Sequence, residues 1–196
     1  GALYLDTDLD ELIVFDGTIW RFVRGGGLFP ANAIAFDQFD ATDSTVLSTR
    51  VTEYGQKAWD AFNGFAGVIT LRQAVPDSST IAGINVGQAT WTLEIDAVSI
   101  PSGSGFYCRH SGGNDHNGLG LRNNAGTWQW WKTNGDAGST SIAYSAGQRL
   151  KVVVTSTDLT LHIGGSSHTL TDSTWNTQTR FAFLLNGTWD NFVVYP

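Results

Sequence analysis

Short runs of alternating hydrophobic and polar residues recur about every eight to twelve residues from Phe36 to the end of the chain. Groups of Gly, Asn and Asp, which tolerate positive backbone φ angles, separate these runs. The pattern predicts an all-β fold, a two-sheet β-sandwich or jelly roll. The expected strands lie near residues 68–73, 80–85, 90–98, 104–110, 117–122, 127–132, 149–155, 158–163, 178–184 and 190–195.

Residues 1–24 form a smaller unit. Its short apolar runs lie at residues 2–6, 12–15 and 20–23. They predict a β-hairpin or meander that is too small to bury a core alone. Three consecutive glycines and Pro30 then interrupt regular structure, so we expect a Gly-rich linker over residues 25–35 and the sandwich over residues 36–196.

The composition suits a folded β protein. Hydrophobic residues make up 41% of the 196 residues, with 8 Trp and 11 Phe, which is enough for one sandwich core plus a small appendix. The 23 glycines and the low charged fraction of 15% favour short strands joined by tight turns. Cys108 is the single cysteine, so we expect no internal disulfide and a buried, inert thiol.

Charge and hydropathy argue against two kinds of partner. The formal net charge is −7 and only 3 lysines occur, so nucleic acid is not expected as a partner. No apolar stretch reaches the roughly 20 residues that cross a bilayer, so membrane insertion is not expected either. Because the chain contains no Met, we expect Gly1 to lie within a longer chain.

Two strings near the start of the chain carry a resemblance, Gly-Ala-Leu-Tyr-Leu-Asp-Thr-Asp and Leu-Ile-Val-Phe-Asp-Gly-Thr-Ile-Trp. Together they resemble a short hairpin unit common in phage tail and fibre proteins. In those proteins the unit sits between trimeric shaft segments and terminal domains. The resemblance implies a virion or extracellular location and a homo-oligomer, with a trimer favoured.

Four further segments carry a second resemblance through their order, at residues 36–44, 86–93, 106–109 and 189–194. This order, over about 160 residues, is similar to that of concanavalin-like or laminin-G-like domains. The resemblance implies a concanavalin-like β-sandwich with a role in sugar binding and adhesion. Some members of this family are glucanases.

One segment is a candidate for catalysis, Leu93-Glu94-Ile95-Asp96-Ala97-Val98-Ser99. Laminarinase-type glucanases of this fold carry E-x-D-x-x-E on one strand, so the resemblance assigns Glu94 and Asp96 to the nucleophile and its helper. Ser99 replaces the final acid, although a retaining glycosidase needs two carboxyl groups about 5 to 5.5 Å apart. We therefore expect no catalysis and interpret the segment as a half-buried strand with both acids outward.

Alternation within the neighbouring expected strands assigns side chains to two faces. For residues 127–132 the concanavalin-like resemblance implies which face is which, because the matching strand of that family keeps its first and third large residues in the core. The inward set is Phe106, Cys108, Leu119, Leu121, Trp128 and Trp130. If these strands are neighbours, one outer face collects the candidate ligand-binding residues Glu94, Asp96, Tyr107, Arg109, Arg122, Gln129 and Trp131. Such a mixture suits a saccharide, but a solvated face with ion pairs has the same pattern. Trp131 could equally contact a ligand or pack on the surface.

Metal sites have weak support. The histidines lack zinc-site spacing, so no zinc is expected. They are His110, His116, His162 and His168. Asp37 in the first sandwich strand and Asp190 in the last are weak candidates for a structural calcium, because terminal strands often pair in such sandwiches. Buried or turn-capping roles are the other interpretation, and no other cofactor is expected.

These features predict a non-catalytic adhesion or carbohydrate-binding module of a phage-type virion appendage, such as a tail fibre, head fibre or receptor-binding protein. Its partner would be a cell-surface glycan or other virion proteins. A structural decoration subunit that binds no glycan is the first alternative. A glycan-cleaving enzyme that uses a loop carboxylate is the second. The functional prediction rests largely on resemblance, because fold alone does not establish function.

Overall fold

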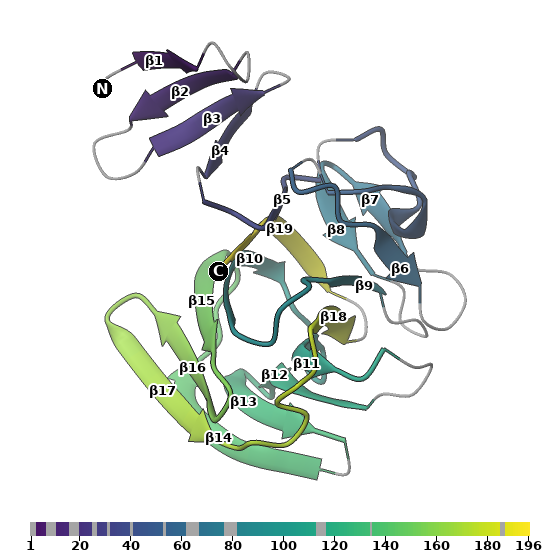
Figure 1. Ribbon diagram of the computed structural model, residues 1–196. Coiled ribbons are helices and arrows are strands. Elements are labelled where there is room, and N and C mark those ends of the chain that lie inside the picture. Colours follow the sequence, from purple (N-terminus) through teal and green to yellow (C-terminus); the bar gives the residue numbers. More distant parts are fainter. Residues whose placement is uncertain are drawn as a thin grey trace.

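The computed structural model shows an all-β chain in which two antiparallel sheets form a sandwich, as the sequence pattern predicts (Figure 1). It describes residues 3–6, 11–15, 20–24, 27–30, 32–39, 41–52, 54–61, 67–76, 82–112, 117–133, 135–184 and 187–196, and only the backbone of the first four strands. A short 3-10 helix, Leu47–Thr49, lies in the sandwich. Over these ranges no helix has the length and apolar character needed to cross a membrane.

One layer of the sandwich is a seven-stranded sheet with the order β14-β13-β12-β11-β18-β9-β6. Its strands are β6 (Trp59–Ala61), β9 (Ala82–Asn85), β11 (Gly105–His110), β12 (Gly118–Asn124), β13 (Thr127–Lys132), β14 (Gly135–Ala143) and β18 (Arg180–Leu184). Strands β11 to β14 pair in succession. The Asn123-Asn124-Ala125-Gly126 segment, one of the Gly- and Asn-containing groups between strands, joins β12 to β13, with Ala125 and Gly126 at positive φ.

The other layer is an eight-stranded sheet with the order β17-β16-β15-β10-β19-β8-β7, and β5 also pairs with β19. Its strands are β5 (Ala35–Asp37), β7 (Val68–Thr70), β8 (Gln73–Val75), β10 (Trp91–Ser99), β15 (Gln148–Val154), β16 (Asp158–Ile163), β17 (Ser166–Thr171) and β19 (Thr188–Tyr195). Asp37 lies opposite Phe192. The predicted pairing of the first and last sandwich strands is therefore confirmed.

The hydrophobic core lies between the two sheets. In β10, buried residues alternate with less buried ones, so Trp91, Leu93, Ile95 and Ala97 face inward. The inward set predicted on β11, β12 and β13 is confirmed, because all six side chains are fully buried: Phe106, Cys108, Leu119, Leu121, Trp128 and Trp130. Aromatic stacking adds about 1 kcal/mol per pair beyond burial.

A separate four-stranded sheet precedes the sandwich, with the order β1-β2-β3-β4. Its strands are β1 (Leu3–Asp6), β2 (Glu11–Phe15), β3 (Trp20–Arg24) and β4 (Gly27–Pro30). β4 lies in the segment predicted as a linker. Arg24 pairs with Gly27. In the sequence, a Gly-Gly pair between two strands favours a two-residue hairpin. Pro30 is tolerated because β4 is an edge strand.

The sequence pattern does not indicate β14 or β17, which lie side by side at one edge of the sandwich (Figure 1). Each is the outermost strand of its sheet. In β14 only Thr140 is buried, and in β17 no residue is buried. Because edge strands of this kind bury few side chains, their hydrophobic alternation is too weak to predict them.

Candidate functional site

The outer face of the seven-stranded sheet brings together four of the seven predicted ligand-binding residues, Tyr107, Arg122, Gln129 and Trp131. The strand register explains this arrangement. Trp131 lies opposite Gly120, which lies opposite Tyr107 on the next strand, while Gln129 lies opposite Arg122. Residues two apart on a strand share a face, so two neighbouring rows hold two rings, an amide and a guanidinium.

Arg122 is the centre of this face. Its guanidinium carbon lies 3.9 Å from the centroid of the Trp131 ring, which is a cation–π contact. Its Nε and Nη2 donate to Oε1 of Gln129 at 3.0 and 2.9 Å, and Nη2 also donates to Oδ1 of Asp136 at 2.6 Å. The Asp136 side chain is 54% exposed. We refer to Arg122, Gln129, Trp131 and Asp136 as the outer-face site.

Asp136 belongs to the site but not to the predicted set. No strand is expected from the sequence between residues 132 and 149, whereas Asp136 lies in β14 opposite Trp131. The Asn134-Gly135 pair before it is a turn signal. Gly135 pairs with Lys132 and Asp136 with Trp131, so β14 runs back beside the end of β13, and this turn signal could have found Asp136.

Tyr107 supports the site from beneath and does not form its surface. The residue is completely buried, in a cluster with Ala182, Leu184 and the partly buried Trp131. Burial raises the pKa of Tyr107 above its ordinary value, so the phenol stays protonated at neutral pH. The predicted face is right, but the predicted exposure is wrong because packed neighbours cover the ring.

Glycines form the floor between these side chains. A Cβ at Gly120 would lie 2.0 Å from the backbone oxygen of Phe106, and one at Gly105 would lie 1.9 Å from that of Leu121. Neither position therefore accepts a side chain without a backbone shift. Gly105 pairs with Arg122, so the row beside Arg122 begins with bare backbone.

Arg109 is not on the outer face, so this prediction is wrong. The register of β11 against β12 shifts between Tyr107 and Arg109, which marks a β-bulge at Cys108. The extra residue reverses the alternation, so Arg109 lies opposite the inward-facing Leu119 and is completely buried. Its guanidinium donates to the backbone oxygens of Thr155, Asp172 and Thr174. Arg109 thus ties the two layers together and is not a ligand contact.

Glu94 and Asp96 face outward as predicted, but on the other sheet. β10 belongs to the eight-stranded sheet, so the seven predicted residues do not share one face. Arg149 bridges the two acids, with Nη2 3.3 Å from Oε2 of Glu94 and Nη1 3.0 Å from Oδ1 of Asp96. Asn191 donates to the second oxygen of Asp96 at 2.6 Å. The face of the eight-stranded sheet therefore matches the alternative interpretation, in which the predicted residues belong to a solvated surface with ion pairs.

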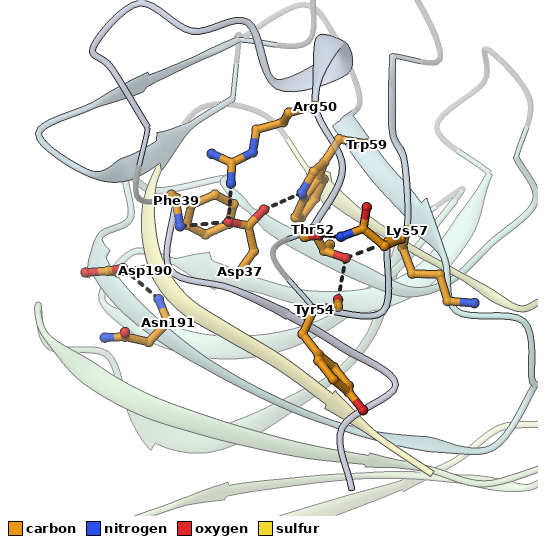
Figure 2. Close-up of polar contacts among 10 residues, drawn as sticks. Asp37, Phe39, Arg50, Thr52, Tyr54, Lys57, Trp59, Asp190 and Asn191 are labelled. Carbon is orange, nitrogen blue, oxygen red and sulfur yellow. Dashed lines mark hydrogen bonds and ion pairs between the residues drawn. The ribbon is translucent and has the colours of Figure 1, made fainter. Parts of the chain in front are cut away.

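Asp37, a weak calcium candidate, is fully buried and surrounded by donors (Figure 2). Its Oδ1 accepts hydrogen bonds from the Phe39 backbone N–H at 2.8 Å and from Arg50 Nη2 at 2.7 Å. Its Oδ2 accepts one from Trp59 Nε1 at 2.7 Å. Three protein donors therefore use the oxygens that a calcium ion would need. The structure favours the buried structural role for Asp37.

Asp190, the other weak calcium candidate, makes a separate contact. Its Oδ1 accepts the backbone N–H of Asn191 at 2.7 Å, and Figure 2 shows this bond apart from those of Asp37. In the part of the chain that the structure describes, no group of three or more His, Cys, Asp and Glu side chains could hold a metal. The calcium hypothesis gains no support from the geometry.

Comparison with known proteins finds similar folds but no family. No protein-family model matches the chain, and no curated protein matches it. Among solved structures, Trypanosoma rangeli sialidase in complex with 2,3-difluorosialic acid (covalent intermediate) has a TM-score of 0.53 at 12% identity, and the same enzyme in complex with sialic acid has 0.52 at 13%. Domain 4 of AbnA, a GH43 extracellular arabinanase from Geobacillus stearothermophilus, in complex with arabinotriose, has 0.47 at 16%.

The coverage of these matches limits what they show. The sialidase match covers 98% of this chain and 41% of the sialidase, so the chain spans less than half of that enzyme. The AbnA match covers 84% of this chain and 92% of the domain. At 12% identity the likeness to the sialidase shows the fold alone. The expectation that the chain is not an enzyme stays a prediction.

Proposed function

We propose that the chain is a non-catalytic carbohydrate-binding module through which a phage-type virion appendage adheres to a host-cell glycan. The outer-face site carries this proposal. It combines a guanidinium and a carboxylate, which hydrogen-bond sugar hydroxyls, with a tryptophan ring that holds the guanidinium in place. The fold likeness to a sialidase whose structure holds sialic acid supports a glycan at the level of fold only.

The site is rigid at Arg122 and open at Asp136. Gln129 is only 9% exposed and holds the guanidinium with two hydrogen bonds. The Trp131 ring lies against that guanidinium and packs on the buried Tyr107 cluster. Side chains held in this way lose little entropy on binding. One such site still binds weakly, so adhesion depends on several copies acting together.

The N-terminal sheet supports association of copies, as expected for a trimeric appendage. Its register gives two neighbouring cross-strand rows, Tyr4-Ile13-Phe22-Phe29 and Leu5-Leu12-Val23-Leu28. All eight residues of these two rows are apolar or aromatic. A small isolated sheet is marginally stable in water. The same sheet in other copies of the chain supplies matching apolar cover.

Binding of the purified chain to an array of immobilised glycans tests the proposal. Arg122→Gln removes the central cation of the outer-face site. Arg149→Gln is the matched control, because Arg149 is an ion-paired surface arginine on the opposite sheet. We expect R122Q to bind at least about tenfold more weakly than the wild type, with R149Q unchanged. Loss of glycan binding in R149Q alone would show that the binding site lies on the opposite sheet. Binding to no glycan would favour the structural decoration subunit.

Glycan cleavage is the second candidate, because the sialidase with a similar fold is an enzyme. The acids predicted from the sequence, Glu94 and Asp96, share the guanidinium of Arg149, and Ser99 occupies the position of the missing acid. We therefore expect no release of sugar from any glycan that the chain binds. Release that disappears in Glu94→Gln would overturn the non-catalytic part of the proposal and leave glycan recognition standing.

A further inference from the structure

The guanidinium of Arg122 is held on two sides, and its side chain is 19% exposed. The Trp131 ring covers one of its faces, and Oε1 of Gln129 takes the edge formed by Nε and Nη2. At the other edge, Nη2 donates to Asp136, while Nη1 has no hydrogen bond to any residue that the structure describes. A guanidinium fixed in this way presents a fork of donors that matches the shape of a carboxylate.

Asp136 places a carboxylate of the chain itself at this edge, 2.6 Å from Nη2, with 54% of its side chain exposed. Gly135 and Gly138 flank it in β14 at positive φ, and a Cβ at either would meet nothing within 4 Å. The edge strand is therefore uncrowded at this point. Since exposed ion pairs contribute little free energy, Asp136 can turn into water at small cost.

The position beside Arg122 in its cross-strand row is a buried glycine. Gly105, its partner on β11, admits no side chain, and the same row continues to Leu184 on β18. Because neighbouring strands lie about 4.8 Å apart, Arg122 and Leu184 are about 10 Å apart across the sheet. No side chain therefore stands between the cation and Leu184, which is itself buried.

We infer that the outer-face site selects saccharides that carry a carboxylate, and that Asp136 is the chain's own competitor for that position. The inference rests on the proposed function and narrows it to acidic glycans. The ligand carboxylate pairs with Nη1 and Nη2 of Arg122, and Asp136 turns into solvent. The net charge of −7 repels an acidic ligand mainly through charges that lie far from the site. Salt screens charges more than about 8 Å apart, so this repulsion is weak.

Isothermal titration with matched probes tests the inference. The probes are trigalacturonic acid and its methyl ester, and a sialic acid methyl glycoside and its methyl ester, so that each pair differs in the charge of the carboxyl group. We expect at least one acid to bind about tenfold more tightly than its ester. Asp136→Asn should tighten binding of that acid about two- to fivefold. Arg122→Gln should abolish the preference, and Arg149→Gln should keep it.

The outcomes separate this inference from the proposed function. Equal binding of acid and ester, or weaker binding of the acid by D136N, overturns the inference, because Asp136 would then accept hydrogen bonds from sugar hydroxyls. Binding of neutral glycans on the array without binding of either acid also overturns it, and leaves the proposed function standing. Binding of no glycan of either kind overturns both. Because Asp136 is exposed, D136N tests the inference even if R122Q fails to fold.

Discussion

Replacing Asp37 by alanine is expected to lower the free energy of unfolding of the sandwich by about 3–5 kcal/mol. The carboxylate is fully buried and accepts hydrogen bonds from Phe39, Arg50 and Trp59. Alanine would leave the backbone N–H of Phe39 and the indole N–H of Trp59 without this acceptor, at a cost of about 1–3 kcal/mol each. The Arg50 side chain is 12% exposed, so water can replace only part of the hydrogen bonding that its guanidinium loses.

Urea unfolding, followed by the near-ultraviolet circular dichroism of the tryptophans, measures this effect. With a slope of about 2 kcal/mol per molar urea, the midpoint should fall by about 2 M. The urea midpoint of Asp37→Asn should lie between those of the wild type and D37A. The amide of Asn keeps one acceptor oxygen, but its NH2 group is a donor placed beside other donors. Asp136→Ala is the matched control. It breaks an ion pair of similar length, 2.6 Å, whose carboxylate is exposed, and should cost less than about 1 kcal/mol.

A D37A midpoint close to that of D136A, at an unchanged slope, would refute the reasoning. The two aspartates each pair with an arginine at nearly the same distance, 2.7 and 2.6 Å. They differ in burial and in the number of donors they satisfy. Equal effects would mean that burial of the Asp37 cluster does not determine its contribution to stability.

Three further predictions concern the glycine floor, one turn and acid stability. Gly120→Ala should destabilise the fold by about 3 kcal/mol, because its Cβ would lie 2.0 Å from a backbone oxygen, whereas Gly165→Ala, with nothing within 4 Å, should leave the melting temperature nearly unchanged. The double variant Leu71→Asn, Arg72→Gly should raise the melting temperature by relieving about 1 kcal/mol of strain, since both residues have positive φ, 50° and 60°; a lower value would contradict this. Burial alone would raise the pKa of Asp172, but hydrogen bonds hold it below its ordinary value, so its stabilising effect is present above about pH 4 and is lost as the pH falls further. Asp172→Asn should therefore narrow the difference between the urea midpoints at pH 7 and pH 3, and an unchanged difference would contradict the direction of that shift.

Alternation predicts which side chains of a central strand are buried, because the backbone forces a period of two. Trp128 and Trp130 follow it fully. Alternation does not show which strands share a sheet. Glu94 was expected beside Tyr107 for that reason, whereas β10 pairs with β15 and β19, which lie far along the chain. Long-range pairing of this kind leaves no local trace in the sequence.

A β-bulge, which adds a single residue to one strand, is equally hard to predict from the sequence. Gly-Phe-Tyr-Cys-Arg-His fits either phase of alternation, so only the pairing of β11 with β12 shows that Cys108 forms a bulge and that Arg109 lies inside. Asp136 was missed for a related reason. Its strand contains mostly small residues and buries only one side chain, so the hairpin that brings Asp136 beside Trp131 has no hydrophobic signature.

The position of β19 has a consequence for the order of events during synthesis. This strand lies inside its sheet between β10 and β8, and it is the partner of β5, although Asp37 and Phe192 are about 155 residues apart. A ribosome adds about 5–20 residues per second, so about 8–30 s pass between the two strands. During that interval the nascent β5 and one edge of β10 lack their partner, which is the condition under which neighbouring chains mispair. The N-terminal sheet, built from consecutive hairpins, can close long before.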